Sequence, residues 1–144
     1  MSADQLFTMA NAAVLPGWIA LAFLPLWKRA DRFIVGVVIT LLAALYVYLL
    51  ASAFKPADFS SFGSLDGILA LFQNKMLLLA GWVHYLAFDL LTGLFIVRNA
   101  RAHRIAHLLA LLCAFGAFMM GPAGLLLYLL IRFLKTGQYF AAND

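Results

Sequence analysis

Two ionisable side chains, His84 and Asp89, lie inside the apolar run 76–97, MLLLAGWVHYLAFDLLTGLFIV. A helix of about 22 residues is about 33 Å long, which matches the hydrocarbon thickness of a membrane. A carboxylate near the centre of such a helix costs on the order of 2.5 to 3.5 kcal/mol, so Asp89 requires a partner, a proton or a water-lined cavity. Because an apolar site favours the protonated carboxyl, Asp89 is a candidate catalytic acid and neutral His84 a candidate base. The alternative is structural: a hydrogen bond between helices for Asp89, and one backbone carbonyl for His84.

The periodicity of this helix decides which side chains can act together. Trp82, Tyr85 and Asp89 share one face, because they are separated by three, four and seven positions. His84 is turned about 140° away from Asp89 around the helix axis. We therefore expect the two groups to act at different points of a long substrate, or through Tyr85, the third candidate catalytic residue, and water.

Metal chemistry is not expected. His103 and His107 stand four residues apart and could share one face of a helix, but the chain has three histidines in total and a single cysteine, Cys113. The alternative is that the two histidines belong to a basic turn that contacts lipid headgroups.

The composition indicates a membrane protein. Hydrophobic residues make up 66% of the 144 residues and charged residues 11%, far from the values of about 45–50% and 25% in soluble domains. The basic residues flank apolar runs, so the net charge of +4 indicates lipid headgroups and not nucleic acid. We predict one all-α integral membrane domain over residues 1–144.

Four apolar runs predict a four-helix transmembrane bundle, with helices near 5–27, 33–54, 76–97 and 108–134. Between the second and third runs, Leu65, Ile68, Leu69 and Phe72 repeat on one helical face, with Ser64 as a cap. We expect this segment, near 64–74, to be an interfacial helix.

The distribution of Lys and Arg predicts the orientation. Six lie in the connections that follow the first and third predicted helices, and four lie on the opposite side of the membrane. The positive-inside rule therefore places both termini outside the cytoplasm. The expected location is the bacterial inner membrane.

Polar side chains of the predicted helices share a layer about 9–14 Å below the non-cytoplasmic face, and Asp89 lies deeper, near the Gly121-Pro122 break. Pro122 is expected to leave the carbonyl of Phe118 without its helical donor. The layer predicts a cavity that opens to the outer leaflet and accepts a long flat apolar ligand. The candidate substrate-binding residues are Asn11, Trp82, Tyr46, Tyr128, Phe118, Gly121 and Pro122.

The run GWVHYLAFD at 81–89, followed by the small-residue break GPAGLLLY at 121–128, resembles the abscisic-acid-deficient-four-like family of small membrane proteins from plants and bacteria. The resemblance covers most of the chain. In plants that family is linked to the formation of neoxanthin from violaxanthin, an isomerisation that opens a carotenoid epoxide and leaves an allene. The resemblance thus implies a carotenoid or other isoprenoid substrate, with one acid, one base and no cofactor.

Three classes of function are left open. The first is a cofactor-free isomerase of carotenoid type, and the second is a non-catalytic pigment- or lipid-binding accessory protein. The third is a small proton-coupled transporter or channel that titrates Asp89, although four short helices give little scope for alternating access. The expected partners are membrane lipid and a long apolar ligand, and a homo-oligomer is left open.

Overall fold

The computed structural model of the chain, which describes residues 1–24, 26–27 and 29–137, is helical throughout, and these residues contain no strand. The helices follow one another along the chain as α1 (Ala3–Ala22), α2 (Ala30–Phe33), η1 (Ile34–Ile39), α3 (Thr40–Ala53), η2 (Pro56–Gly63), α4 (Leu65–Phe72), α5 (Lys75–Ala102), α6 (His107–Met120) and α7 (Pro122–Thr136). The predicted all-α class is confirmed.

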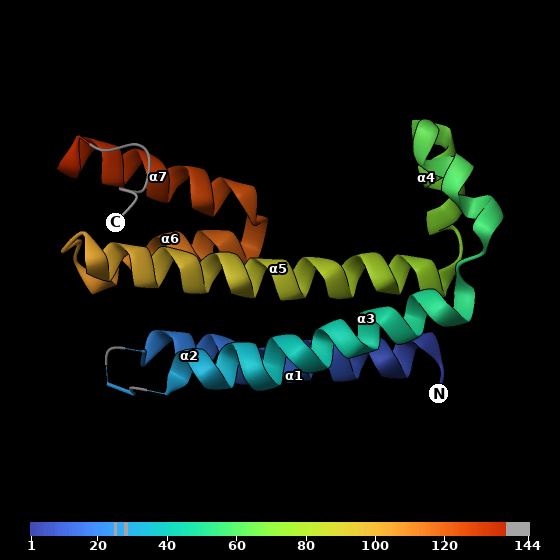
Figure 1. The fold of residues 1–144 in the computed structure, drawn as a ribbon, viewed down its shortest axis with the longest axis horizontal. Helices are drawn as coiled ribbons and strands as arrows, with labels where there is room; N and C mark the ends of the chain where they lie inside the picture. The colour runs from blue at the N-terminus through green and yellow to red at the C-terminus, as the bar shows by residue number, and fades with distance from the viewer. Residues whose placement is uncertain (25, 28, 138–144) are drawn as a thin grey trace.

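Helix α5 is the centre of the molecule. It is 28 residues long, begins where the Asn74 side chain accepts a hydrogen bond from the Met76 backbone N–H at 2.9 Å, and packs against α1, α3 and α6 (Figure 1). Its buried positions occur all round the helix, as expected of a helix enclosed by neighbours. Three segments are long and apolar enough to cross a membrane, Ala3–Ala22, Ala30–Ala53 and Lys75–Ala102, so the first three predicted crossings are confirmed in length and composition.

The predicted short helix is α4. The Ser64 hydroxyl accepts a hydrogen bond from the Gly67 N–H at 3.1 Å, which is the expected cap. A 3-10 helix, η2, precedes α4, and both project from the bundle at the end that holds the N-terminus (Figure 1).

The fourth crossing predicted over 108–134 is wrong. Gly121 adopts a positive φ of 39° and ends α6, Pro122 begins α7, and the chain reverses into a helical hairpin (Figure 1). Proline cannot donate the next helical hydrogen bond, and glycine permits the positive φ. A Cβ built on Gly124 would lie 2.0 Å from the Ala117 nitrogen, so the two helices meet backbone to backbone. Each helix is about 21–23 Å long, too short to span a bilayer.

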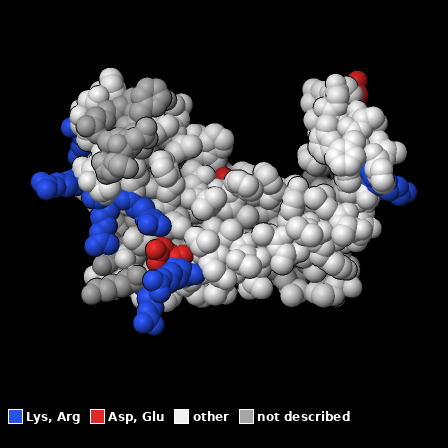
Figure 2. Space-filling model, viewed as in Figure 1, with Lys and Arg blue, Asp and Glu red and all other residues white. Residues whose placement is uncertain are grey.

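The hairpin also changes the orientation of the chain. The N-terminus and the end of α7 at Thr136 lie at opposite ends of the bundle (Figure 1), so the prediction of both termini on one side is wrong, because it depended on a fourth crossing. Basic side chains gather at one end of the molecule (Figure 2). Of the nine described Lys and Arg, two lie near the N-terminal end, Lys55 and Lys75, and the other seven belong to the opposite end: Arg29, Arg32, Arg98, Arg101, Arg104, Arg132 and Lys135.

We predict that the arginine-rich end is cytoplasmic and the N-terminus is not, because basic residues are retained on the cytoplasmic side. Single cysteines at Ser2, Arg101 and Lys135 can be tested in intact cells with an impermeant maleimide; native Cys113 is buried. Ser2→Cys should label directly, and Arg101→Cys and Lys135→Cys only after permeabilisation. Labelling of Lys135→Cys but not Arg101→Cys in intact cells would place the two residues on opposite sides of the membrane and would contradict the hairpin in favour of a fourth crossing.

Candidate functional site

An apolar groove of about 500 Å³ lies between α1, α4 and α5. We call it the aromatic groove, and its lining consists of Ala3, Asp4, Phe7, Phe72, Lys75, Leu78, Leu79, Gly81, Trp82 and Tyr85. Lys75 and Asp4 are exposed, with 3.8 Å between Nζ and Oδ1, and they mark the polar end of the groove. The groove therefore lies in the half of the bundle where the outer cavity was predicted.

Trp82 forms one wall of the aromatic groove and is held by Asn11. The Trp82 Nε1–H donates a hydrogen bond to Asn11 Oδ1 at 3.1 Å, and the Asn11 amide donates in turn to the Phe7 carbonyl at 2.8 Å. The Phe7 and Trp82 rings lie 5.7 Å apart. Trp82 thus lines the groove, whereas Asn11 positions the indole and does not itself line the groove.

Tyr85 connects the groove to the α6–α7 hairpin. Its ring stacks on Trp82 with 5.5 Å between centroids, and its hydroxyl donates to the Met119 carbonyl at 3.0 Å. That carbonyl belongs to the last turn of α6, where helical donors are missing. Met119 is a contact that the sequence did not predict: the carbonyl expected to be free was that of Phe118.

Asp89 lies one helical turn beyond Tyr85. It is 7% exposed, and its Oδ1 would be 2.6 Å from a Cβ built on Gly121. The Oδ2 atom of this carboxyl is buried with no hydrogen-bond partner among the described residues. The carboxyl therefore faces the Gly121 turn that joins α6 to α7. The prediction that Asp89 lies in the interior, next to the Gly121-Pro122 break, is confirmed.

His84 is not part of this arrangement. It is exposed, its ring stacks on Phe88 at 4.5 Å, and it meets Tyr46 at 5.8 Å, on the side of α5 that faces α3. The expectation that His84 faces the interior is wrong, because its ring is exposed beside α3, whereas the hairpin covers the Asp89 face of α5. Tyr46 accompanies His84 and does not line the aromatic groove.

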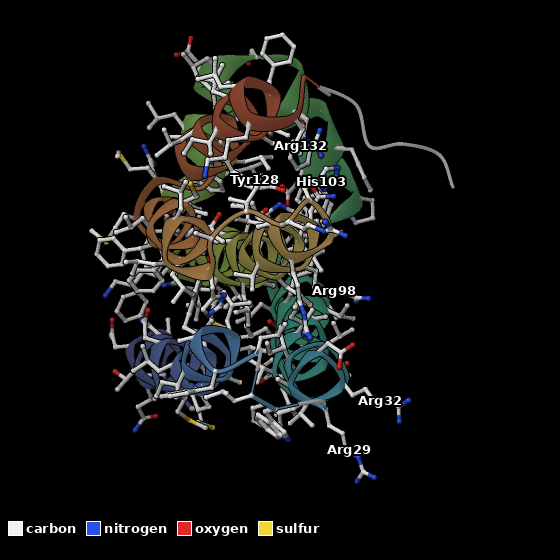
Figure 3. All side chains as sticks on the ribbon, turned by 90° about the vertical axis from the view of Figure 1, so that its left-hand side faces the viewer. Arg29, Arg32, Arg98, His103, Tyr128 and Arg132 are labelled. Atoms are coloured by element: carbon white, nitrogen blue, oxygen red, sulfur yellow. The ribbon has the colours of Figure 1, made fainter. Side chains whose placement is uncertain are left out.

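Tyr128 lies at the opposite end of the bundle from its predicted position. Its hydroxyl donates to Asn99 Oδ1 at 2.5 Å, and the same oxygen accepts from Arg132 Nη1 at 2.8 Å. His103 Nδ1 lies 2.9 Å from the Asn99 carbonyl. Figure 3 shows Tyr128, Arg132 and His103 close to one another. The prediction counted depth along a straight helix, and the reversal at Gly121 carries Tyr128 back toward the arginine-rich end.

Two other predicted binding residues flank the hairpin turn. Phe118 packs edge-on against Trp18, with 5.1 Å between centroids, and Pro122 is exposed at the start of α7. Neither lines the aromatic groove. Conversely, Phe7 and Phe72 line it without having been predicted, because only the packing of α1 and α4 on α5 brings them to Trp82.

The two histidines of the basic turn do not converge on a common point. His107 Nε2 lies 3.0 Å from the Ala22 carbonyl of α1, while His103 contacts Asn99 on its own helix. Within the described part of the chain, no three His, Cys, Asp or Glu side chains form a group that could hold a metal ion.

Comparison with known proteins identifies the family. No curated protein and no solved structure matches the chain. A family model described as ABA DEFICIENT 4-like matches residues 5–128, from α1 into α7, and so includes Trp82, Tyr85, Asp89 and Gly121. The chain therefore belongs to the ABA DEFICIENT 4-like family.

Proposed function

We propose that this protein binds a carotenoid or another long isoprenoid in the aromatic groove and isomerises it by proton transfer at Asp89, without a cofactor. The family is associated with carotenoid and neoxanthin-related function. The observation that carries the proposal is the buried Asp89 carboxyl, whose Oδ2 has no partner among the described residues, one turn beyond the lining residue Tyr85.

The groove suits a flat apolar ligand. Its volume of about 500 Å³ falls within the range of about 300–1,000 Å³ for small-molecule sites. Its wall carries the rings of Phe7, Phe72, Trp82 and Tyr85, and its charged groups are Lys75 and Asp4. An extended polyene can lie along the rings with a polar end group near that ion pair.

The reaction requires only one titrating residue. Protonated Asp89 would donate its proton to an epoxide oxygen as the C–O bond breaks, giving a hydroxyl group and a carbocation. The Asp89 carboxylate would then remove a proton from the neighbouring polyene carbon, whose C–H electron pair completes the allene. Asp89 returns to its starting state, so substrate and product are isomers and no redox change occurs.

Tyr85 would relay the proton in this scheme. It lines the aromatic groove, whereas Asp89 does not, and it precedes Asp89 by one turn on the same face of α5. Tyr85 thus takes the place that His84 held in the sequence-based hypothesis.

A second candidate is a non-catalytic pigment- or lipid-binding accessory protein. It is favoured by the position of His84: the residue proposed as the base lies beside Tyr46 of α3 and does not line the aromatic groove. Both candidates predict a bound ligand, and only the first predicts that the ligand changes.

The test is to purify the full chain from carotenoid-producing cells and to identify the bound pigment and its isomers. Leu78 lines the groove and is 51% exposed, so Leu78→Trp should fill space that the ligand needs. We expect bound pigment to fall by at least about tenfold, the equivalent of about 1.4 kcal/mol. Leu112→Trp is the matched control, because Leu112 is 58% exposed on α6 and does not line the groove. Equal pigment in both variants would contradict binding in the aromatic groove.

A further inference from the structure

A second groove, of about 730 Å³, lies on the arginine-rich half of the bundle. We call it the arginine groove; its lining comes from η1, α5 and α7 and consists of Val35, Leu91, Thr92, Leu94, Phe95, Arg98, Asn99, Ala102 and Leu125. It shares no lining residue with the aromatic groove, which uses α5 only as far as Tyr85. The proposed isomerase site therefore does not account for it.

The groove is apolar along most of its length and cationic at one end. Leu91 and Phe95 form its wall on α5, and Arg98 follows on the same helical face. The distance from Leu91 to Arg98 along the helix axis is about 10 Å. An occupant that fits this pattern has an apolar chain and an anionic head.

Arg98 is placed to receive an anion. It also lines the adjoining cavity of about 390 Å³, together with Arg101 and Asp31, so two guanidinium groups border the same space. Its Nη1 lies 3.8 Å from Asp31 Oδ2, and its side chain is 63% exposed. Such a long, exposed ion pair is worth little and leaves guanidinium N–H donors available for a phosphate.

Other arginines at the same end point elsewhere. Arg29 and Arg32 extend outward from α2, away from the bundle, whereas Arg98 lies between α5 and the α2–η1 segment (Figure 3). Neither Arg29 nor Arg32 lines the arginine groove or the adjoining cavity. The charge at the mouth of the groove is therefore a local feature within a generally basic end.

The Val35 wall has unusual backbone geometry. Val35 lies in η1, a π-helical stretch of six residues, and its carbonyl accepts a hydrogen bond from the Thr40 hydroxyl at 2.8 Å. π-helical turns inside longer helices are frequent at functional sites. This backbone irregularity and the cationic mouth are independent observations at the same groove.

We propose that the arginine groove binds an anionic phospholipid. One acyl chain lies along Leu91, Phe95 and Leu125, and the phosphate lies at Arg98 and Arg101. The occupant is a phospholipid because the groove opens on membrane-crossing helices at the end richest in basic residues, the end that we predict to face the anionic cytoplasmic leaflet. The Arg98 guanidinium can bind phosphate oxygens in pairs.

The test uses the full chain in detergent, titrated with dioleoyl phosphatidylglycerol or dioleoyl phosphatidylcholine and followed by native mass spectrometry. We expect phosphatidylglycerol to bind at least about tenfold more tightly. Arg98→Gln should abolish this preference. Arg32→Gln removes the same charge at the same end and should retain it. Equal losses in the two variants would show diffuse attraction and overturn the site.

Asp31→Asn should change the affinity for phosphatidylglycerol in the direction opposite to Arg98→Gln. It frees Arg98 from its ion pair and keeps the oxygen that accepts from the Arg32 N–H at 2.8 Å. Phosphatidylglycerol should therefore bind more tightly to Asp31→Asn, whereas a purely structural role of the Arg98–Asp31 pair predicts weaker binding and contradicts the proposal.

The role of the acyl chain is tested separately. Leu91 is 42% exposed, so Leu91→Trp should fold, narrow the groove and weaken phosphatidylglycerol at least about tenfold. Inorganic phosphate at millimolar concentration should not compete with the lipid. Full competition by inorganic phosphate, or unchanged lipid binding in Leu91→Trp, would show an anion site without a lipid chain.

Discussion

Asp89→Asn is expected to lower turnover at least about 100-fold, the lower end of what general acid–base catalysis contributes. The amide keeps the size and most of the hydrogen-bonding capacity of the carboxyl, so the packing against Gly121 should survive. It cannot deliver and recover a proton under physiological conditions. The measurement is the ratio of pigment isomers in carotenoid-producing cells, normalised to the amount of folded protein and bound pigment.

The matched control for this variant is Asp66→Asn. Asp66 is exposed in the first turn of α4 and outside both grooves, so isomer ratios should not change. A fully active Asp89→Asn protein would eliminate the catalytic assignment and favour the pigment-binding alternative. Loss of both pigment and folded protein would point to a structural role for the carboxyl.

Gly124→Ala is expected to disrupt the α6–α7 hairpin. A Cβ at this position would lie 2.0 Å from the Ala117 nitrogen and 2.5 Å from the Cys113 carbonyl oxygen, and neither backbone atom can rotate away. We expect a loss of about 3 kcal/mol in the free energy of unfolding, at the upper end of typical overpacking costs. The gain in helix propensity of about 1 kcal/mol for Gly to Ala does not offset this. Unfolding by titration with denaturing detergent measures the change.

Gly36→Ala is the control for backbone effects, because a Cβ there meets no atom within 4 Å. Its stability should stay within about 1 kcal/mol of the parent chain. The Gly124→Ala variant should also lose turnover, because opening the hairpin removes the Gly121 turn from Asp89 and the Met119 carbonyl from Tyr85. A Gly124→Ala protein with unchanged stability and turnover would contradict the tight hairpin.

Several features follow from local physics, and the sequence alone was enough to predict them. Apolar length determines that the first three long segments can cross a membrane. Ser64 caps α4 because a hydroxyl satisfies an unpaired N–H wherever the helix begins. Asp89 lies in the interior because a carboxyl facing lipid has no compensating partner.

Whether the last apolar run, 108–134, crosses the membrane or forms a hairpin depended on tertiary packing. Gly121-Pro122 is compatible with a kinked crossing and with a full reversal, since glycine and proline permit both locally. The reversal is stabilised by the packing of Gly124 on Ala117 across the turn, and by the hydrogen bond from the Tyr85 hydroxyl to the Met119 carbonyl on another helix. The apolar pattern of the run contains neither contact, so the fourth crossing and the position of Tyr128 were predicted wrongly.

The residues of the candidate site were likewise determined partly by the sequence and partly by the tertiary structure. The spacing of Trp82, Tyr85 and Asp89 determined that they share a face of α5, and that His84 lies on another. Only the tertiary structure decided which face the neighbours cover: α1 and α4 form the aromatic groove with Trp82, and the hairpin closes over Asp89, which leaves His84 exposed. A helix that is apolar on all sides carries no signal for the direction it will face, and that direction is chosen by the side chains that pack against it.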